Sequence, residues 1–292
     1  MQEFRFTTQK IRVQRALMDD VTLSIVIVTW NTKELTSKCI ESIYNLQEYS
    51  SLKPEVIVID NNSADGSAEY IKERFPEVRL IVNSSNFGYA PACNQGMKGA
   101  NGKYILLLGS DTELKDGSLT ECVKFLDTKP GCGAVGCKLV YPDGREQGNC
   151  KKFPTLMNGV FTYLSMDFMN KDYDMAWFKY DETIIVDQIA TTFLMIRREV
   201  LEKAGYFDEQ YRILYNDVDL CQRIYGAGYD IFFIHTAEVV HHGSYSTKSA
   251  PPKVRKIMYK DVYRYYRNNF GIPAVILIPI LSVRFILVSI FR

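Results

Sequence analysis

The hydrophobic positions of this chain form short, unbroken runs, and the stretches between them are amphipathic. The first two runs, at residues 23–28 and 56–59, are almost wholly apolar and rich in β-branched side chains. Such runs are typical of strands that are covered on both faces of a sheet. Between them, Cys39, Ile43 and Leu46 recur at helical spacing. The pattern therefore predicts a strand, a helix and a second strand, which is the repeating unit of a parallel sheet.

The same alternation continues along most of the chain. Further strands are predicted at residues 78–82, 104–108, 134–140, 186–197 and 229–234. Further helices are predicted at residues 67–74, 90–100, 118–126 and 198–204, and another begins at residue 216. Residues 148–181 break the pattern and are interpreted as an irregular insert. We expect an α/β fold in which helices flank a mostly parallel, Rossmann-like central sheet.

Polar side chains follow several of the predicted strands. Asn31 and Asp60 stand at the carboxyl ends of the first two strands, and Asp111 follows the apolar run at 104–108. In open α/β sheets, ligands bind outside these strand ends. One or two carboxylates are enough to hold a divalent cation against a phosphate, so Asp111 is a candidate metal ligand.

Four further residues could take part in the chemistry. His241 or His242 could complete a metal site, since imidazole suits Mn²⁺ better than Mg²⁺, although an isolated histidine is more often structural. At the start of a predicted helix, either Asp217 or Asp219 could serve as a general base. The alternative role for these two carboxylates is compensation of the helix dipole.

Composition and charge narrow the range of partners. The 292 residues are 47% hydrophobic and 24% charged, and the formal net charge is +1. This is the composition of a globular protein, without a basic field that would favour nucleic acid. The seven cysteines are scattered and lack the spacing of a metal site. Reduced thiols in a cytoplasmic compartment are the simplest interpretation.

The two ends of the chain differ from the middle. Residues 1–20 lack the continuous apolar core of a signal peptide and form an N-terminal lead-in. Residues 273–291 are apolar except for Arg284 and follow a basic, tyrosine-rich stretch at 253–267. By length alone this run could equally be a core helix, but the basic lead-in favours a helix that lies in a membrane surface without spanning it. The expected segments are a lead-in at 1–20, a globular domain at 21–247 and a membrane-associating segment at 248–292.

Eight short motifs follow one another between residues 23 and 247. They are IVIVTWN, VIVIDNNSADGS, NSSNFGYAPACNQG, YILLLGSDTEL, AVGCKLVYPDG, FLMIRREVLEKAGYFDE, YNDVDLCQR and VVHHGSYST. Each motif is weak alone, but the ordered set resembles glycosyltransferase family 2, the inverting enzymes with the GT-A fold, and within it the bacterial rhamnosyltransferases. The resemblance implies a GT-A fold for almost the whole globular domain.

The resemblance also implies roles for residues at matching positions. The residues that would contact the nucleotide-sugar donor are Thr29, Asn31, Asp60, Asn62, Asn86, Gly88 and Asn94. Asp111 would hold a divalent cation, Mn²⁺ or Mg²⁺, and His241 would join it, with His242 as the less favoured choice. Asp217 would be the catalytic base, which takes the proton from the acceptor hydroxyl as that group attacks the anomeric carbon.

The implied reaction is the inverting transfer of a sugar from dTDP-rhamnose or a UDP-sugar to a hydroxyl of a glycan or lipid-linked glycan. It would serve cell-surface polysaccharide synthesis at the cytoplasmic face of the inner membrane. The chain departs from the family pattern at residues 109–110 and 190–191 and at Asn216, which leaves a non-catalytic nucleotide-sugar or glycan-binding relative as the alternative. A nucleotidyltransferase is disfavoured, because residues 29–34 contain no glycine.

Overall fold

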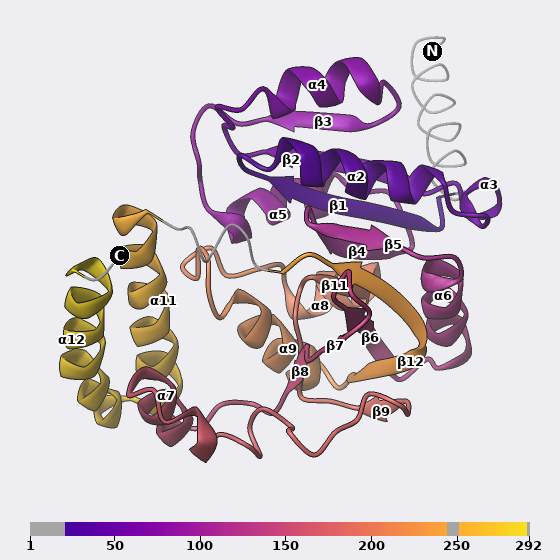
Figure 1. Ribbon diagram of the computed structural model, residues 1–292. Coiled ribbons are helices and arrows are strands. Elements are labelled where there is room, and N and C mark those ends of the chain that lie inside the picture. The colour runs from indigo at the N-terminus through magenta and orange to yellow at the C-terminus, as the bar shows by residue number, and fades with distance from the viewer. Residues whose placement is uncertain (1–20, 244–250, 291–292) are drawn as a thin grey trace, which may run out of the picture.

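The computed structural model describes residues 21–243 and 251–290, the last three of these by their backbone alone. The predicted lead-in at 1–20 and the end of the last motif, at 244–247, lie outside the described residues. Most of the described chain is built around one mixed, curled sheet with helices on both of its faces (Figure 1).

The sheet consists of a parallel half and a mixed half. Its main strands lie in the order β3 (Arg79–Val82), β2 (Glu55–Asp60), β1 (Leu23–Thr29), β4 (Tyr104–Gly109), β11 (Phe193–Arg197), β6 (Cys132–Val140), β12 (Asp230–His241) and β5 (Thr112–Leu114). The short strands β7 (Glu146–Gln147) and β9 (Ile184–Ile185) pair with β6 and β12. The first four strands in this order run parallel, and β11 lies antiparallel between β4 and β6. The polar ends of β1, β2 and β4 therefore meet at one edge.

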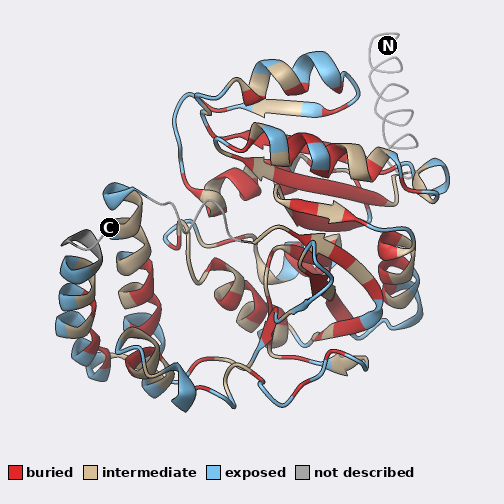
Figure 2. Cartoon of the chain, in the orientation of Figure 1, coloured by how far each residue is buried: buried red, intermediate tan, exposed pale blue. Residues whose placement is uncertain are grey.

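Two hydrophobic clusters cover the two faces of the sheet. One contains side chains of α2 (Lys33–Tyr44), α4 (Ser67–Arg74) and α6 (Ser118–Thr128). The other contains side chains of α5 (Tyr89–Gly99), α8 (Arg198–Ala204) and α9 (Asn216–Gly226). A short helix, α3 (Tyr49–Leu52), precedes β2. Figure 2 shows that the central strands are buried almost throughout, which is why they appear in the sequence as unbroken apolar runs. The predicted α/β fold with helices that flank a central sheet is confirmed.

The last strand is longer than predicted. The sequence pattern ends it at residue 234, whereas β12 continues to His241. The pairing of β12 with β6 is irregular between Ile234 and Glu238, and beyond this point Val239 pairs with both β6 and β5. An irregularity of this kind interrupts the alternation of side chains and so hides the second half of the strand. His241 therefore stands on a strand and not on a polar loop.

The insert at 148–181 is less irregular than predicted. It contains β8 (Cys150–Lys151), which pairs with β10 (Gln188–Ile189), the helix α7 (Leu156–Tyr163) and a 3₁₀ turn, η1 (Asp167–Met169). Thr155 and Asn158 close the start of α7 with a capping box. Asn158 stands where Glu or Gln usually completes this motif, so the helix start is hard to recognise in the sequence.

The C-terminal part forms a helical hairpin beside α7 (Figure 1). It consists of α11 (Pro252–Phe270), a 3₁₀ helix η2 (Ile272–Ile276) and α12 (Leu277–Ile290). Tyr265 and Tyr266 of α11 share a hydrophobic cluster with Tyr211 and with Val218 of α9. No helix in the described part of the chain is both long enough and apolar enough to cross a membrane. The division at residue 247 and the association with a membrane stay predictions.

The cysteines are all part of the interior. Each of the seven is free and buried. Burial raises the pKa of the Cys39 thiol to about 12, and a hydrogen bond with Thr112 opposes this shift only in part. Such cysteines behave as small hydrophobic side chains.

Candidate active site

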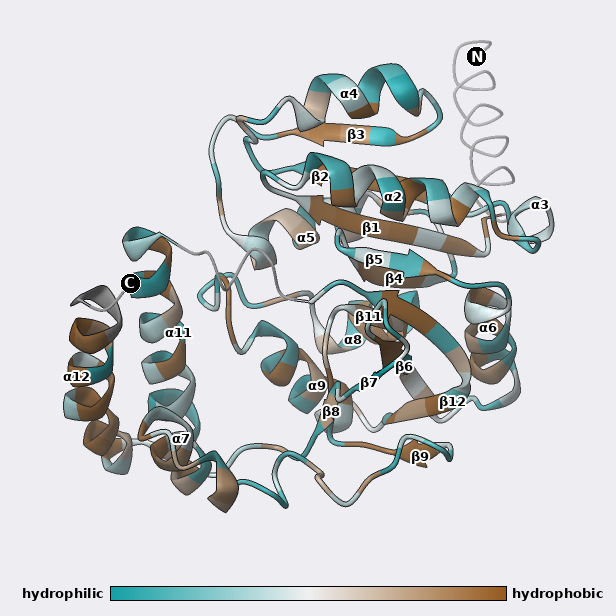
Figure 3. Ribbon diagram, in the orientation of Figure 1, coloured by the Kyte–Doolittle hydropathy of each residue, from teal (hydrophilic) through white to brown (hydrophobic). Residues whose placement is uncertain are grey.

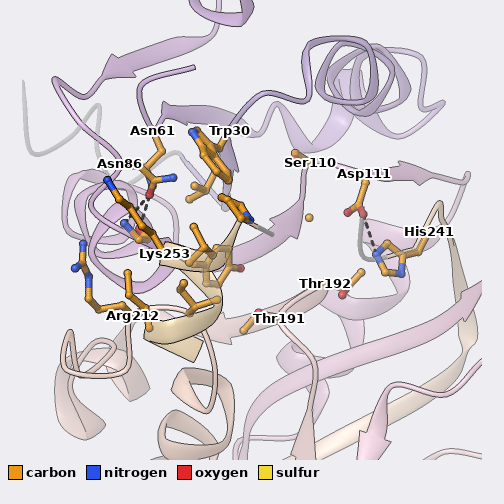
Figure 4. A pocket seen from close by; sticks show the side chains of 18 residues that line it. Trp30, Asn61, Asn86, Ser110, Asp111, Thr191, Thr192, Arg212, His241 and Lys253 are labelled. Carbon is orange, nitrogen blue, oxygen red and sulfur yellow. Dashed lines mark hydrogen bonds and ion pairs between the residues drawn. The ribbon is translucent and has the colours of Figure 1, made fainter. Parts of the chain in front are cut away.

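A pocket of about 600 Å³ opens at the carboxyl ends of β1 and β4. Its polar and aromatic lining residues are Trp30, Asn61, Asn86, Tyr89, Ser110, Asp111, Thr191, Thr192, Arg212, His241 and Lys253. Figure 4 shows Trp30, Asn61 and Asn86 gathered at one end of the pocket and the pair of Asp111 and His241 at the other. Among the residues predicted for the site, those in the pocket wall are Asn86, Gly88, Asp111 and His241.

Asp111 and His241 form a possible cation site. Nε2 of His241 lies 3.3 Å from Oδ2 of Asp111, and Nδ1 of His241 lies 2.7 Å from Oε1 of Gln147. A carbonyl oxygen can only accept, so Nδ1 carries a hydrogen and donates it to Gln147. Nε2 faces the carboxylate oxygen of Asp111, and an imidazole nitrogen together with a carboxylate oxygen is a ligand pair that suits Mn²⁺.

The protein offers few other ligands at this place. No group of three His, Cys, Asp or Glu side chains in residues 21–243 and 251–290 could hold a metal ion. His242 is turned away from the pair, since its Nε2 lies 2.7 Å from Oε1 of Glu113. A cation at Asp111 and His241 would therefore take most of its ligands from phosphate oxygens and water, as Mg²⁺ and Mn²⁺ commonly do.

Asn61 organises the opposite end of the pocket, and sequence reasoning did not select it. Its amide nitrogen donates to Oδ1 of Asn86 at 3.0 Å and to the carbonyl of Gly88 at 3.1 Å. Its amide oxygen accepts from the backbone nitrogen of Phe87 at 3.1 Å. The buried side chain thus fixes the loop that carries Asn86. Its position directly after Asp60 in the DNNS motif is the sequence feature that could have identified it as a residue of the site.

Asp60 lies beneath this end of the pocket. It is buried, and its Oδ2 accepts from the backbone nitrogen of Ser63 at 3.0 Å. Its Oδ1 has no hydrogen-bond partner among the described residues, and such an orphaned oxygen is unusual in a protein interior. Asn31 and Asn62, both exposed, have positive φ angles of 54° and 64°. Oδ1 of Asn31 accepts from the backbone nitrogen of Ala64 at 2.7 Å and so fixes the loop after Asp60.

Thr29 and Asn94 have their polar atoms engaged within the protein. The hydroxyl of Thr29 is fully buried and lies 2.8 Å from that of Thr36. The amide of Asn94 donates to the carbonyl of Phe207 and accepts from its backbone nitrogen. Neither residue lines the pocket. Thr29 is the last residue of β1, and Asn94 contacts the loop that leads to Arg212.

Asp217 stands in the first turn of α9 and is partly buried. Burial raises the pKa of its carboxyl group, and a hydrogen bond from the backbone nitrogen of Val218 opposes this shift. Burial raises the pKa of Tyr89, a side chain of the pocket wall, and the charge of Asp217 adds to this rise. Asp217 itself does not line the pocket. Asp219 differs, because it forms a salt bridge of 2.7 Å with Arg223.

Two cationic side chains border the pocket, and neither was predicted. Arg212 donates through Nε and Nη2 to the carbonyl of Phe87, so its guanidinium group joins two loops. Lys253 is exposed in the first turn of α11. Neither could be assigned to the pocket from the sequence, because both reach it only through the packing of distant segments.

Comparison with known proteins identifies the family. The family model for Glycosyl transferase family 2 matches residues 24–205. N-acetylglucosaminyl-diphospho-decaprenol L-rhamnosyltransferase of Mycobacterium tuberculosis is 26% identical over 268 residues, which are 86% of this chain and 86% of that protein.

Solved structures share the fold. The crystal structure of GalNAc-T7 with UDP, GalNAc and Mn²⁺ has a TM-score of 0.62 at 17% identity and covers 84% of this chain, which spans about half (48%) of that chain. The mannosyltransferase PcManGT from Pyrobaculum calidifontis in complex with GDP-Man and Mn²⁺ has a TM-score of 0.57 at 20% identity, over 89% of this chain and 68% of that one. Since the family model matches more than half of its residues, the chain belongs to glycosyltransferase family 2.

Proposed function

We propose that this chain catalyses the inverting transfer of a sugar from a nucleotide-diphosphate-sugar to a hydroxyl group of a glycan or lipid-linked glycan. The observation that carries the proposal is the two-ended pocket. At one end, the carboxylate of Asp111 and the imidazole of His241 suit a cation that is shared with a diphosphate. At the other end, amide and aromatic side chains such as Asn86 and Trp30 suit a nucleoside.

The donor-binding roles rest on the environment of each residue. Asp60 would accept a hydrogen bond from the base, and its unpartnered Oδ1 supports this role. Asn62, Asn86 and Gly88 would border the donor directly. The residues that would act by holding loops and strand ends in position are Thr29, Asn31 and Asn94.

Asp217 is the proposed base. Inversion needs one group that takes a proton from the attacking hydroxyl, and it needs no covalent nucleophile. A carboxylate with a raised pKa is a stronger base than an ordinary aspartate. Asn216, one of the positions at which the chain departs from the family pattern, is buried and donates to the carbonyl of Ile213 at 3.1 Å. It can therefore serve the loop without taking part in proton transfer.

A divalent cation, Mn²⁺ or Mg²⁺, is the proposed cofactor. Asp111 and His241 would hold it, and when bound it would offset the charge on the departing nucleoside diphosphate. The Gln147 side chain would keep the His241 imidazole in the tautomer that presents Nε2. The two solved structures that contain Mn²⁺ support this cofactor by analogy of fold.

The donor is proposed to be dTDP-rhamnose or a UDP-sugar, and the acceptor a lipid-linked glycan at the cytoplasmic face of the inner membrane. The support is the name of the mycobacterial relative, an L-rhamnosyltransferase of a decaprenol-linked substrate, and the UDP in one related structure. This places the proposed reaction in the synthesis of a cell-surface polysaccharide.

Thermal-shift measurements with a panel of nucleotide-sugars, with and without Mn²⁺, test the proposal. We expect one donor to raise the melting temperature, Mn²⁺ to increase that effect, and Asp111→Ala to remove the increase. A metal response that survives in Asp111→Ala would place the cation elsewhere. Hydrolysis of the selected donor then separates an enzyme from a non-catalytic binding protein, since the latter would bind the donor without consuming it.

A further inference from the structure

A second cavity, distant in the sequence from the motifs of the pocket, lies between α11 and α12. It is a groove of about 830 Å³. Its basic lining residues are Lys256, Lys260, Arg264 and Arg267, all on α11. Their spacing of three or four residues places them in one row along a single face of the helix.

Most of this positive charge has no counter-charge within the described residues. Lys256, Lys260 and Arg267 form no salt bridge with the part of the chain that the structure describes. The only carboxylate of α11, Asp261, is buried and accepts from the backbone nitrogens of Ile213 and Leu214. It faces the globular domain and reaches only Arg264 of the row, at 3.9 Å.

The opposite wall of the groove is apolar and exposed. Ile278 and Ile286 of α12 line it and are 44% and 55% exposed. Figure 3 shows the hydrophobic character of α12 along its length. The charge in this helix, Arg284, points inward, where it donates to the carbonyls of Thr162 and Tyr163 at 3.2 and 3.1 Å. The outer face of α12 is therefore apolar and unlike an ordinary water-exposed helix.

We propose that the α11–α12 groove binds the headgroups of anionic phospholipids, while the exposed apolar side chains of α12 enter the interfacial layer of the bilayer. A row of unpaired cations next to an apolar helix matches an anionic headgroup with its acyl chains. A second copy of this chain is a poorer match, because a two-fold contact across the groove would bring two like-charged rows together. This inference rests on the proposed function and assigns a site to its membrane partner.

The position of α11 connects the two cavities. The first turns of this helix supply Lys253, Val254 and Ile257 to the wall of the catalytic pocket, and the following turns supply the cations of the groove. Asp261 fixes the middle of α11 to the loop before α9. The helix α9 carries Asp217. A bilayer bound at the groove would thus hold the pocket close to the surface in which a lipid-linked acceptor resides.

Flotation of the full chain with phospholipid vesicles tests the site. One set contains phosphatidylglycerol and phosphatidylcholine, and the other contains phosphatidylcholine alone. We expect preferential binding to the anionic vesicles, and the double variant Lys256→Glu/Lys260→Glu should weaken it by at least about tenfold. The matched control is Lys38→Glu/Lys72→Glu, which changes the net charge equally at exposed positions far from the groove and should bind like the wild type.

Three outcomes would overturn the proposal. Equal loss of binding in both double variants would show a response to net charge alone, and unchanged binding in the groove variant would place the membrane contact elsewhere. Ile286→Ser tests the apolar wall and should weaken binding to both vesicle sets. If the chain instead dimerises without lipid and Ile286→Ser abolishes that dimer, the groove is a protein interface.

Donor hydrolysis in solution should be unchanged in the groove variants, so failure of the lipid site is distinguishable from failure of the proposed activity.

Discussion

Asp217 has a carboxyl group whose burial affects activity and stability in opposite ways. The raised pKa makes the carboxylate a better base, but the same burial makes the charged form costly to the folded state. In the charged state the group receives one backbone hydrogen bond, from Val218. Substitution by asparagine, which keeps the shape and removes the charge, separates the two effects.

The first prediction concerns activity. Asp217→Asn should lower the rate of transfer by roughly 10²–10⁴-fold and leave donor affinity within a few-fold, because a base acts in the transition state. In the wild type, the rate should rise with pH through a pKa above the ordinary value for aspartate of about 3.9, since the carboxylate is the active form. Rate profiles of both proteins between pH 4 and 9 check this. A variant that keeps the wild-type rate would exclude Asp217 as the base.

The second prediction concerns stability. A carboxyl group whose pKa is higher in the folded than in the unfolded state stabilises the fold only at low pH, and the effect is lost as the pH rises through the folded pKa. At pH 7 the wild type therefore carries a buried charge that Asp217→Asn lacks. The variant should melt roughly 2–4 °C higher at pH 7, and the difference should shrink at acidic pH. A difference that does not depend on pH would show that another effect of the substitution dominates.

At the level of elements, the loop before α5 depends on a glycine. Gly88 has a φ of 99°, and a Cβ atom there would lie 3.0 Å from the carbonyl oxygen of Arg212. That carbonyl accepts from the backbone nitrogens of Tyr89 and Ala90. The loop after β3 and the loop before α9 are thus packed backbone to backbone, and both border the pocket proposed to bind the donor.

The third prediction follows from this contact. Gly88→Ala should cost about 1–3 kcal/mol of folding free energy through backbone strain and should also weaken donor binding, because the Arg212 loop must move. Gly117→Ala is the matched control, since Gly117 also has a positive φ of 84° but has open space around its Cβ position. Gly117→Ala should lose stability but keep the wild-type affinity for the donor. Chemical denaturation and donor titration of both variants check this, and equal donor affinity in both would contradict it.

The elements that the sequence predicts well are those whose burial is uniform. β1, β2 and β4 are apolar along their length because both faces are covered, and their polar ends led directly to Asp60 and Asp111. The second half of β12 was missed because an irregular pairing interrupts its pattern. Arg212 and Lys253 could not be found from the sequence, since only the docking of α11 and of the loop before α9 brings them to the pocket.

At the scale of the whole molecule, the C-terminal hairpin is joined unequally to the rest. α11 contributes Val262, Tyr265 and Tyr266 to a shared core, whereas α12 buries chiefly Leu277 and Leu281. The two helices therefore differ in how far the fold depends on them.

The fourth prediction uses this difference. Truncation after Phe270 removes the burial of Ala274, Leu277 and Leu281. The two leucines account for about 3–6 kcal/mol, which lies at the lower end of the roughly 5–15 kcal/mol that stabilises a domain. The shortened protein should melt cooperatively at a lower temperature and still bind donor. Truncation after residue 250 also removes the tyrosines of α11 and should prevent folding. Calorimetric melting of both proteins checks this, and a non-cooperative transition in the longer one would make α12 an essential part of the core.

The burial of all seven cysteines has a practical consequence for the study of this molecule. Thiolates are the reactive form of cysteine, and the raised pKa values of these inaccessible groups keep them protonated. The native protein should therefore resist alkylation by maleimides. A single cysteine introduced at the exposed position Asn269, which lies on α11 outside the groove lining, would become a selective attachment point for a fluorescent dye, and contact of α11 with lipid could be followed without removing any native thiol.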